Sequence, residues 1–563
     1  MLLIAISWCY ILFSLLNIGM ATLKVLKIQI DNFYFTAFFG LFGATVLASL
    51  WSLFGRLNIE FHIFLLVLNG LLLYFLWSDC KQLYTRFLHQ IKNLNWPVQV
   101  LFAGFSIVLL AQSATAPFIV DNESYYIQTI KWLNEYGLVK GIANLHPFLA
   151  VSSGWHVTQA AFNFSFLYDR FNDLNGLCLW LLLGFAFDKY NVDLNKETKV
   201  LNFIGILPLL ALFLFQFVSA PSPDLPIYCC TFLIVYIFFE KENYGYPQVF
   251  IITFVLAVFA CYLKPTAVAL VLFPFYILCT QFKTVKSVLL RMTVLGGLVL
   301  LLFISKNTIV SGYPFFPVVG FQFMSVDYAM PIPIAQFYFE QTKLVAFNCT
   351  SDQFASFSPV DRFYRWITLS GLHGFFNALA VLLLFIVPVI FGFFRKRKAI
   401  GVVYCIMTVQ LVLLFFTSPQ YRFFINFILV FILLFVVYYL KNKRILMALQ
   451  FCSLFLVLIM LSNKIPLQSL SANPNFQTNR VFSIENLIYP HSNSSLGLSF
   501  ERIQKGNLLY FSPHANSLFW EIGNASLPAT NKYELAYFEQ YFGYVPQMRT
   551  QDLADGFYAK KIK

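Results

Sequence analysis

Charged residues are scarce in this chain: Asp, Glu, Lys and Arg make up 11% of its 563 residues, whereas hydrophobic residues make up 59%. Soluble domains carry about 25% charged residues, so the composition excludes a soluble globular protein and predicts a polytopic membrane protein. The apolar runs are continuous and do not alternate with a period of two, which argues against a membrane β-barrel. The first run lacks a basic segment and a cleavage site, so we expect a retained helix and not a signal peptide.

Other features are also missing. Nine of the ten cysteines fall in or beside apolar runs, and only Cys349 lies in a predicted external loop, so no disulfide framework is expected. The sequence has no glycine-rich nucleotide-binding loop and no internal repeat. Nothing in this pattern points to a nucleotide-driven activity.

Apolar runs of about 17 to 25 residues, enough to cross roughly 30 Å of hydrocarbon, indicate about 14 transmembrane helices. The candidates lie near 1–19, 33–54, 61–78, 98–116, 174–187, 200–218, 225–239, 247–262, 266–281, 286–304, 374–394, 399–416, 421–440 and 445–462. We expect an all-α membrane protein whose core, 98–462, follows N-terminal helices in 1–97 and carries long loops at 117–173 and 305–373. The more polar tail, 463–563, is predicted to form a small extracytoplasmic α/β domain.

The distribution of Lys and Arg predicts the orientation. Seven loops that share one side hold 19 of the 38 Lys and Arg but 7 of the 25 Asp and Glu: 20–32, 79–97, 188–199, 240–246, 282–291, 395–398 and 441–444. The positive-inside rule makes these loops cytoplasmic and the long loops extracytoplasmic. We therefore expect a multi-pass protein of a cell membrane, the bacterial inner membrane. The net charge of +13 is topological, so it favours membrane lipids and not nucleic acid as a partner.

The stretch DNESYY, residues 121–126, opens the first long loop and places Asp121 and Glu123 two residues apart. From Glu123 onward, apolar residues recur at helical spacing, which predicts a short amphipathic helix on the membrane surface that ends near Gly137 or Gly141. Asp121 then has two alternative roles. It is a candidate catalytic carboxylate, or it is the N-cap of that helix.

Three further ionisable residues lie at predicted span boundaries on the same side as Asp121: Asp224 in SAPSPDLP, Lys264 in YLKPTA and Arg422 in TSPQYRFF. Taken singly, each could anchor a helix at the interface, and Asp224 could cap its helix. Taken together, acids and bases on one face outline a site for an anionic ligand beside a base.

These motifs resemble those of the GT-C class of membrane glycosyltransferases. A carboxylate pair in the first large external loop, an amphipathic helix after it and LHPF at 145–148 are similar to protein O-mannosyltransferases and to bacterial aminoarabinose and related lipid-linked sugar transferases. The likeness covers roughly 98–440. The chain departs from the class because three predicted spans precede this region, whereas the catalytic loop of the class usually follows the first span.

The resemblance implies an inverting transferase that moves a sugar from a polyprenyl-phosphate-linked donor to an extracytoplasmic glycan, lipid or protein acceptor. Asp121 would be the general base and Glu123 would position the acceptor or tune its neighbour. Lys264, Arg422 and His146 would bind the donor phosphate. His146 could equally be a loop residue with local hydrogen bonds.

Three residues are candidate contacts to the acceptor or substrate: Asp224, Tyr125 and Trp155. Trp155 could instead be an ordinary interface tryptophan. Dependence on a divalent metal is left open, with Asp121, Glu123 and Asp224 as its only candidate ligands. Three other functions stay open. The protein could be a polysaccharide polymerase or ligase, a transporter or lipid flippase, or a non-catalytic assembly scaffold.

Overall fold

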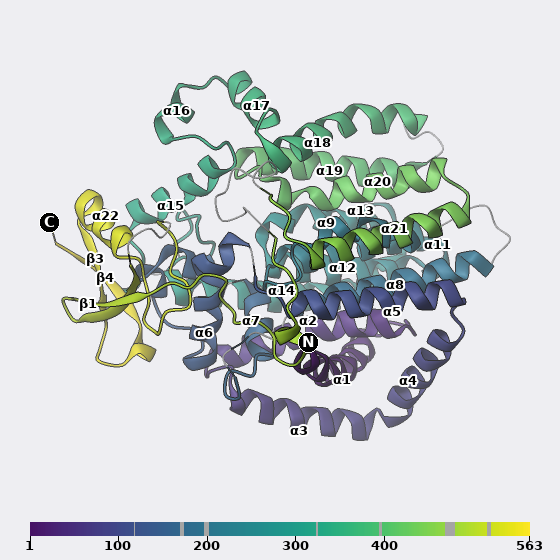
Figure 1. Ribbon diagram of the computed structural model, residues 1–563, viewed down its shortest axis with the longest axis horizontal. Helices are drawn as coiled ribbons and strands as arrows, with labels where there is room; N and C mark the ends of the chain where they lie inside the picture. Colours follow the sequence, from purple (N-terminus) through teal and green to yellow (C-terminus); the bar gives the residue numbers. More distant parts are fainter. Residues whose placement is uncertain are drawn as a thin grey trace.

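The computed structural model describes all residues except 118, 152, 169, 171–173, 196–201, 323–324, 393–396, 468–478, 515–518 and 563. The described chain is mostly helical. Most of the long helices run side by side along the horizontal direction of Figure 1, and the strands gather at one end.

Eight helices in the described residues are long and apolar enough to cross a membrane, which indicates a membrane-spanning protein. They are α1 (Leu2–Leu26), α2 (Phe33–Ser52), α5 (Trp96–Ser113), α12 (Tyr246–Leu263), α14 (Phe282–Ser311), α18 (Gly371–Ile390), α19 (Lys398–Phe416) and α21 (Lys443–Ser462). Their outer faces are apolar: Leu290, Val294 and Leu301 of α14 are 78%, 65% and 63% exposed. Such surfaces suit lipid.

The prediction of 14 spans is not confirmed. Four apolar segments are too short to pass the same length criterion: Phe203–Phe215 (η4 and α9), Asp224–Phe239 (α10), Pro265–Thr280 (η5 and α13) and Ile425–Tyr439 (α20). A 16-residue helix such as α10 covers about 24 Å. Two of the segments begin as 3₁₀ turns that contain proline, which shortens the α-helix that follows. The bundle also contains the helix α8 (Leu174–Asn195).

The segment predicted as the cytoplasmic loop 79–97 contains a helix. α4 (Trp77–Lys92) follows α3 (Ile59–Phe75) at a bend of 91°. Cys80 and Leu83 of α4 are buried, whereas Lys81 and Arg86 are exposed. The helix therefore turns away from the direction of α3 with a charged outer face.

Close helix packing explains two glycines near the N-terminus. A Cβ on Gly19 of α1 would lie 2.0 Å from Thr36 O of α2, and one on Gly40 would lie 1.9 Å from Leu15 O. Small residues at such crossings let two backbones approach, as is typical of membrane helices.

The basic loops meet at one end of the bundle. Gln248 Nε2 donates to Lys27 O at 3.2 Å, Arg291 Nη1 donates to Leu26 O at 2.7 Å, and Lys443 Nζ donates to Asp193 O at 2.5 Å. Gln248 lies near the start of α12, and Lys264 follows its last residue. α12 has 18 residues and is therefore about 27 Å long. The loops at the Lys264 end are separated from the basic loops by the thickness of the bundle.

The tail packs on the first long loop at the Lys264 end. It contains β1 (Phe500–Lys505) paired antiparallel with β2 (Leu508–Pro513), β3 (Tyr544–Met548) paired antiparallel with β4 (Phe557–Lys561), and α22 (Lys532–Phe542). Leu508, Ile522 and Phe557 of the tail share one buried cluster with Trp132 and Ile142 of the loop. The tail and the loop thus form one packed unit.

The remaining helices connect these parts. In the described residues, six short helices lie between the bundle helices in the order of the chain: α6 (Ile127–Glu135), α7 (Gly154–Ala161), α11 (Lys241–Tyr244), α15 (Ile332–Val345), α16 (Ser351–Ser356) and α17 (Pro359–Ile367).

Candidate functional site

The DNESYY stretch folds as one turn of π-helix, Asn122–Tyr126, which leads directly into α6. The predicted helix is therefore present and ends at Glu135, before Gly137 with φ of 76°. It does not lie on a membrane surface, because the tail covers it: Gln128 and Lys131 both donate hydrogen bonds to Ala525 O. π-Helical turns occur frequently at functional sites.

Asp121 makes no capping hydrogen bond, although it occupies the N-cap position of the π-helix. Its carboxylate instead accepts a hydrogen bond from Arg422 Nη1, at 2.5 Å from Oδ2. Tyr126 OH donates to the same oxygen at 3.3 Å. The structure thus disfavours the capping alternative, and it adds Tyr126, five residues along the π-turn, as a contact that helical spacing alone did not suggest.

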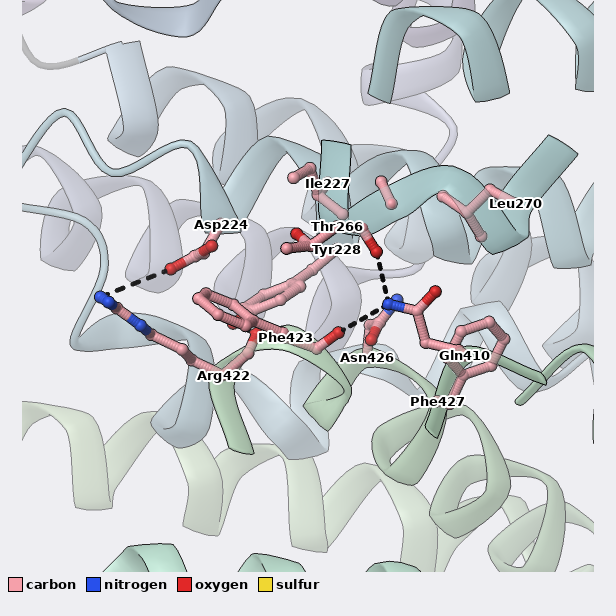
Figure 2. Close-up of a pocket in the computed structure, with 11 residues that line it drawn as sticks. Asp224, Ile227, Tyr228, Thr266, Leu270, Gln410, Arg422, Phe423, Asn426 and Phe427 are labelled. Atoms are coloured by element: carbon pink, nitrogen blue, oxygen red, sulfur yellow. Dashed lines mark hydrogen bonds and ion pairs between the residues drawn. The ribbon is translucent and has the colours of Figure 1, made fainter. Parts of the chain in front are cut away.

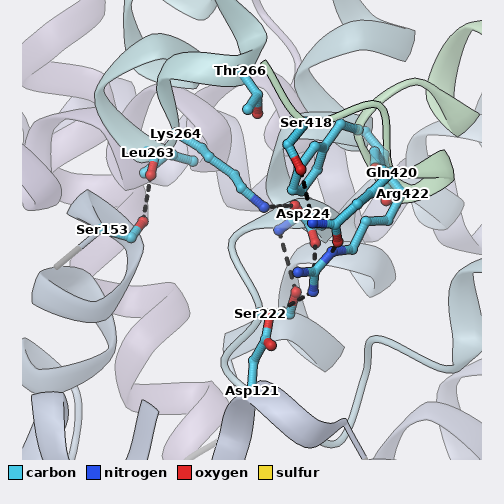
Figure 3. A network of polar contacts seen from close by, with 12 residues as sticks. Asp121, Ser153, Ser222, Asp224, Leu263, Lys264, Thr266, Ser418, Gln420 and Arg422 are labelled. Atoms are coloured by element: carbon cyan, nitrogen blue, oxygen red, sulfur yellow. Dashed lines mark hydrogen bonds and ion pairs between the residues drawn. The ribbon is translucent and has the colours of Figure 1, made fainter. Parts of the chain in front are cut away.

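Asp224 and Lys264 form a second ion pair, with 2.5 Å between Oδ1 and Nζ. Asp224 is the first residue of α10, and Pro223 before it occupies the N-cap position. Its other carboxylate oxygen, Oδ2, is buried without a hydrogen-bond donor and lies 4.0 Å from Arg422 Nη1. Figure 3 shows Asp121, Asp224, Lys264 and Arg422 converging from four separate segments.

Two neighbours orient the cations. Gln420 Oε1 accepts from Arg422 Nε at 3.0 Å, and Lys264 Nζ lies 3.9 Å from the ring centroid of Phe423. A cation over an aromatic face is stabilised by the ring quadrupole. Lys264 therefore pairs with Asp224, whereas Arg422 lies close to both Asp121 and Asp224.

A small pocket opens beside this cluster. Asp224 and Arg422 form its polar rim, and its wall consists of apolar and amide side chains from α10, η5, α19 and α20, including Ile227, Leu270, Gln410, Asn426 and Phe427. In Figure 2, Gln410 reaches across the wall toward Thr266 and Phe423, whose carbonyl oxygens accept from its Nε2 at 2.5 and 3.2 Å. The space in this pocket is about 10 Å³, room for about one water molecule.

The four charges balance, since two carboxylates face two cations. Burial raises the pKa of Asp121, but the nearby Arg422 and Lys264 lower it more, so the pKa ends below its ordinary value. Burial lowers the pKa of Lys264, and Asp224 opposes this effect. Burial also lowers the pKa of Arg422, but Asp121 and Asp224 raise it further, so the guanidinium stays charged. Asp121 is thus a carboxylate held by a permanent cation.

Glu123 lies apart from the cluster. Its carboxylate accepts from the backbone N–H of Ser495 and from Ser494 Oγ, both at 2.8 Å. Its own carbonyl oxygen accepts from the N–H groups of Ile522 and Gly523. Burial raises the pKa of Glu123, with the serine donors opposing. These contacts assign Glu123 to the junction between the loop and the tail.

His146 is also engaged with the tail and not with the cluster. It is fully buried; Nδ1 lies 3.2 Å from Glu534 Oε2, and Nε2 lies 3.1 Å from Trp520 O. Burial raises the pKa of Glu534, while His146 opposes that rise. In this arrangement His146 joins the loop to α22.

The two predicted aromatic contacts differ in position. Tyr125 is 8% exposed and packs edge-on against Tyr126, with ring centroids 4.7 Å apart, next to the cluster. Trp155 is fully buried, and its Nε1 donates to Asn175 Oδ1 at 2.5 Å. Asn175 in turn donates to Ser222 O, two residues before Asp224. Trp155 thus lies behind the cluster.

The three carboxylates named as metal ligands do not converge. Asp121 and Asp224 face cations, and Glu123 faces the tail. Within the described ranges, no three His, Cys, Asp or Glu side chains are grouped so as to hold a metal ion. Asp121 and Asp224 are arranged in ion pairs, and Glu123 is held by serine donors.

Comparison with known proteins identifies a family for this chain. No curated protein and no solved structure matches the chain. A family model described as a domain of unknown function, DUF8201, matches residues 1–429, a range that contains all four residues of the charged cluster. The chain therefore belongs to the DUF8201 family.

Proposed function

We propose that this protein is a membrane glycosyltransferase that moves a sugar from a polyprenyl-phosphate-linked donor to an acceptor hydroxyl. The observation that carries the proposal is the convergence of Asp121 with Asp224, Lys264 and Arg422 at the end of the bundle opposite the basic loops. Under the positive-inside rule this end is extracytoplasmic, and the bacterial inner membrane is the membrane we propose. The GT-C resemblance of the DNESYY and LHPF motifs supports the same assignment.

The charge arrangement supports a phosphate ligand. Arg422 and Lys264 are 24% and 17% exposed, so both cations can be reached, whereas Asp224 is 2% exposed. A donor phosphate could accept the hydrogen bond that Arg422 donates to Asp121 in the absence of the donor. The Asp121 carboxylate would then have fewer hydrogen-bond donors. Since Arg422 lowers the pKa of Asp121, this exchange would make Asp121 a stronger base when the donor is bound.

The proposed reaction is a single displacement. The acceptor oxygen attacks the anomeric carbon and forms the new glycosidic bond, while the bond from that carbon to the phosphate oxygen breaks. The departing polyprenyl phosphate keeps the bonding electron pair, and Lys264 and Arg422 stabilise its added negative charge. Asp121 takes the hydroxyl proton. The configuration at the anomeric carbon is inverted.

The alternative of a transporter or flippase predicts ionisable residues within the depth of the bilayer. The four charges of the cluster instead lie at helix ends or in the turns beside them. This placement favours chemistry at a surface, so the transferase is the better account of these residues.

The test is sugar transfer by the purified full-length protein in proteoliposomes, supplied with a panel of radiolabelled polyprenyl-phosphate sugars and extracts of envelope glycans and lipids. We expect label in one acceptor fraction and release of polyprenyl phosphate. Thermal stabilisation by polyprenyl phosphate, absent in Arg422→Ala, supplies a readout that needs no acceptor. If neither stabilisation nor transfer occurs for any donor, the proposal is wrong.

A further inference from the structure

The helix α17, with sequence PVDRFYRWI, carries its polar and apolar residues in an unusual arrangement. Val360, Phe363 and Tyr364 follow the i, i+3, i+4 spacing of one helix face, and they are 74%, 40% and 66% exposed. A helix on a water-exposed surface normally turns such residues toward the protein.

The two arginines of α17 point the other way. The Arg362 guanidinium lies 4.2 Å from the ring centroid of Phe354 and donates to Phe354 O at 3.2 Å. Arg365 donates from Nε to Phe347 O at 2.9 Å. Both cations are thus directed into the protein by specific bonds while the apolar face is turned outward.

The helix lies where a membrane span begins. Only Thr368, Leu369 and Ser370 separate Ile367, its last residue, from Gly371, the first residue of the apolar helix α18. Asn377 of α18 donates to Trp366 O at 2.8 Å, which fixes α17 against the start of that helix. In Figure 1, α17 lies beside the end of α18. The helix therefore lies directly before an apolar helix long enough to cross a membrane.

We propose that α17 is an interfacial helix whose outward face, formed by Val360, Phe363 and Tyr364, inserts into the membrane at the level of the headgroups. Aromatic residues on an outward apolar face are typical of helices that lie in this zone. The occupant of the face is the bilayer itself, because α17 directly precedes the candidate span α18, whose Phe375 and Phe385 are likewise turned outward, 58% and 71% exposed. This inference does not depend on the proposed enzymatic activity.

The insertion has a structural consequence near the charged cluster. Trp366, on the inner side of α17, is buried and donates from Nε1 to Pro419 O at 2.7 Å. Pro419 precedes Gln420, which accepts a hydrogen bond from Arg422 Nε. A helix anchored in lipid therefore holds one end of the turn that carries the arginine.

The test places a fluorescent amino acid at residue 364 of the full-length protein in nanodiscs containing nitroxide lipids. We expect a headgroup nitroxide to quench it at least about threefold more than the same fluorophore at residue 540 of the tail, an exposed position of α22. The fluorophore at residue 385 of α18 serves as the acyl-chain reference. Quenching at 364 equal to that at 540 would overturn the proposal, whether water, a second copy or another protein covers the face.

A second measurement needs no substitution. Wild-type protein is reconstituted with two diazirine lipids, one reactive near the headgroup and one at the end of the acyl chain, and the cross-linked peptides are mapped. We expect the shallow probe to label residues 359–367 more than the deep probe does. Absence of label from both probes in this peptide, with label present in α18, would also overturn the proposal.

Discussion

Arg422 Nη1 lies 2.5 Å from Asp121 Oδ2, although 301 residues separate the two in the chain. The pair joins the start of the first long loop to the turn before α20, and Asp224 lies within 4.0 Å of the same nitrogen. Arg422 therefore touches both carboxylates of the cluster, so its removal tests the whole arrangement.

Asp121→Asn keeps the size of the side chain and an oxygen that can accept from Arg422. We expect the variant to fold normally and, under the proposed reaction, to lose roughly 10²- to 10⁴-fold in turnover, since an amide cannot take the acceptor proton. Donor binding should persist. Turnover and thermal unfolding measured on the same preparation separate these effects, and full activity would remove Asp121 from the role of base.

The pH dependence follows from the lowered pKa of Asp121. A carboxylate whose folded pKa is depressed adds stability above its unfolded pKa, and that stability is lost as pH falls through the folded value. We expect the acidic limb of kcat/KM in the free enzyme to lie below the ordinary pKa of an aspartate side chain. In Arg422→Lys the limb should stay low, whereas in Arg422→Ala it should move to higher pH because burial is no longer opposed by that cation. Identical acidic limbs in both variants would contradict the assignment.

The pair formed by Asp224 and Lys264 should show strong coupling. Lys264→Met leaves the buried Asp224 carboxylate without its closest cation, and Asp224→Asn leaves Lys264 without its anion. We expect each single variant to lower the free energy of unfolding by roughly 3 kcal/mol, with the double variant losing less than the sum. A double-mutant cycle in urea measures the coupling. Additive losses would show that the two residues act independently.

Glu123→Gln tests the junction between the loop and the tail. The amide loses an acceptor for Ser495 N or Ser494 Oγ, so we expect a loss of about 1–3 kcal/mol and faster proteolysis of the tail. Glu485→Gln is the matched control, because Glu485 is an exposed tail carboxylate. Equal proteolysis rates for the two variants would contradict the junction role of Glu123.

The orientation can be measured with an impermeant thiol reagent. In a background whose exposed cysteines are replaced by serine, cysteine at Thr417 should react from outside, and cysteine at Lys283 should react only after permeabilisation. Both positions are exposed in the structure, so poor access does not confuse the result. The opposite pattern would move the charged cluster to the cytoplasmic face.

The composition by itself determined that the chain is a helical membrane protein, because continuous apolar runs can satisfy their backbone hydrogen bonds in lipid only as helices. The positions of Lys and Arg also grouped the basic loops. The DNESYY stretch pointed to Asp121, and the predicted span boundaries pointed to Asp224, Lys264 and Arg422. Periodicity found the helix that follows Asp121. These features are local, so each could be recognised from neighbours in the sequence.

Only the tertiary structure decided which of those residues meet. Asp121 could have been a helix cap, and the pair with Arg422 depends on how the first loop and the turn before α20 pack in space. Glu123 and His146 belonged to motifs that also predicted the site, yet both lie apart from the cluster. They contact Ser495 and Glu534 of the tail instead. Contacts between segments hundreds of residues apart leave no periodic trace in a single sequence, which is why the partners of a buried charge had to be seen in the fold.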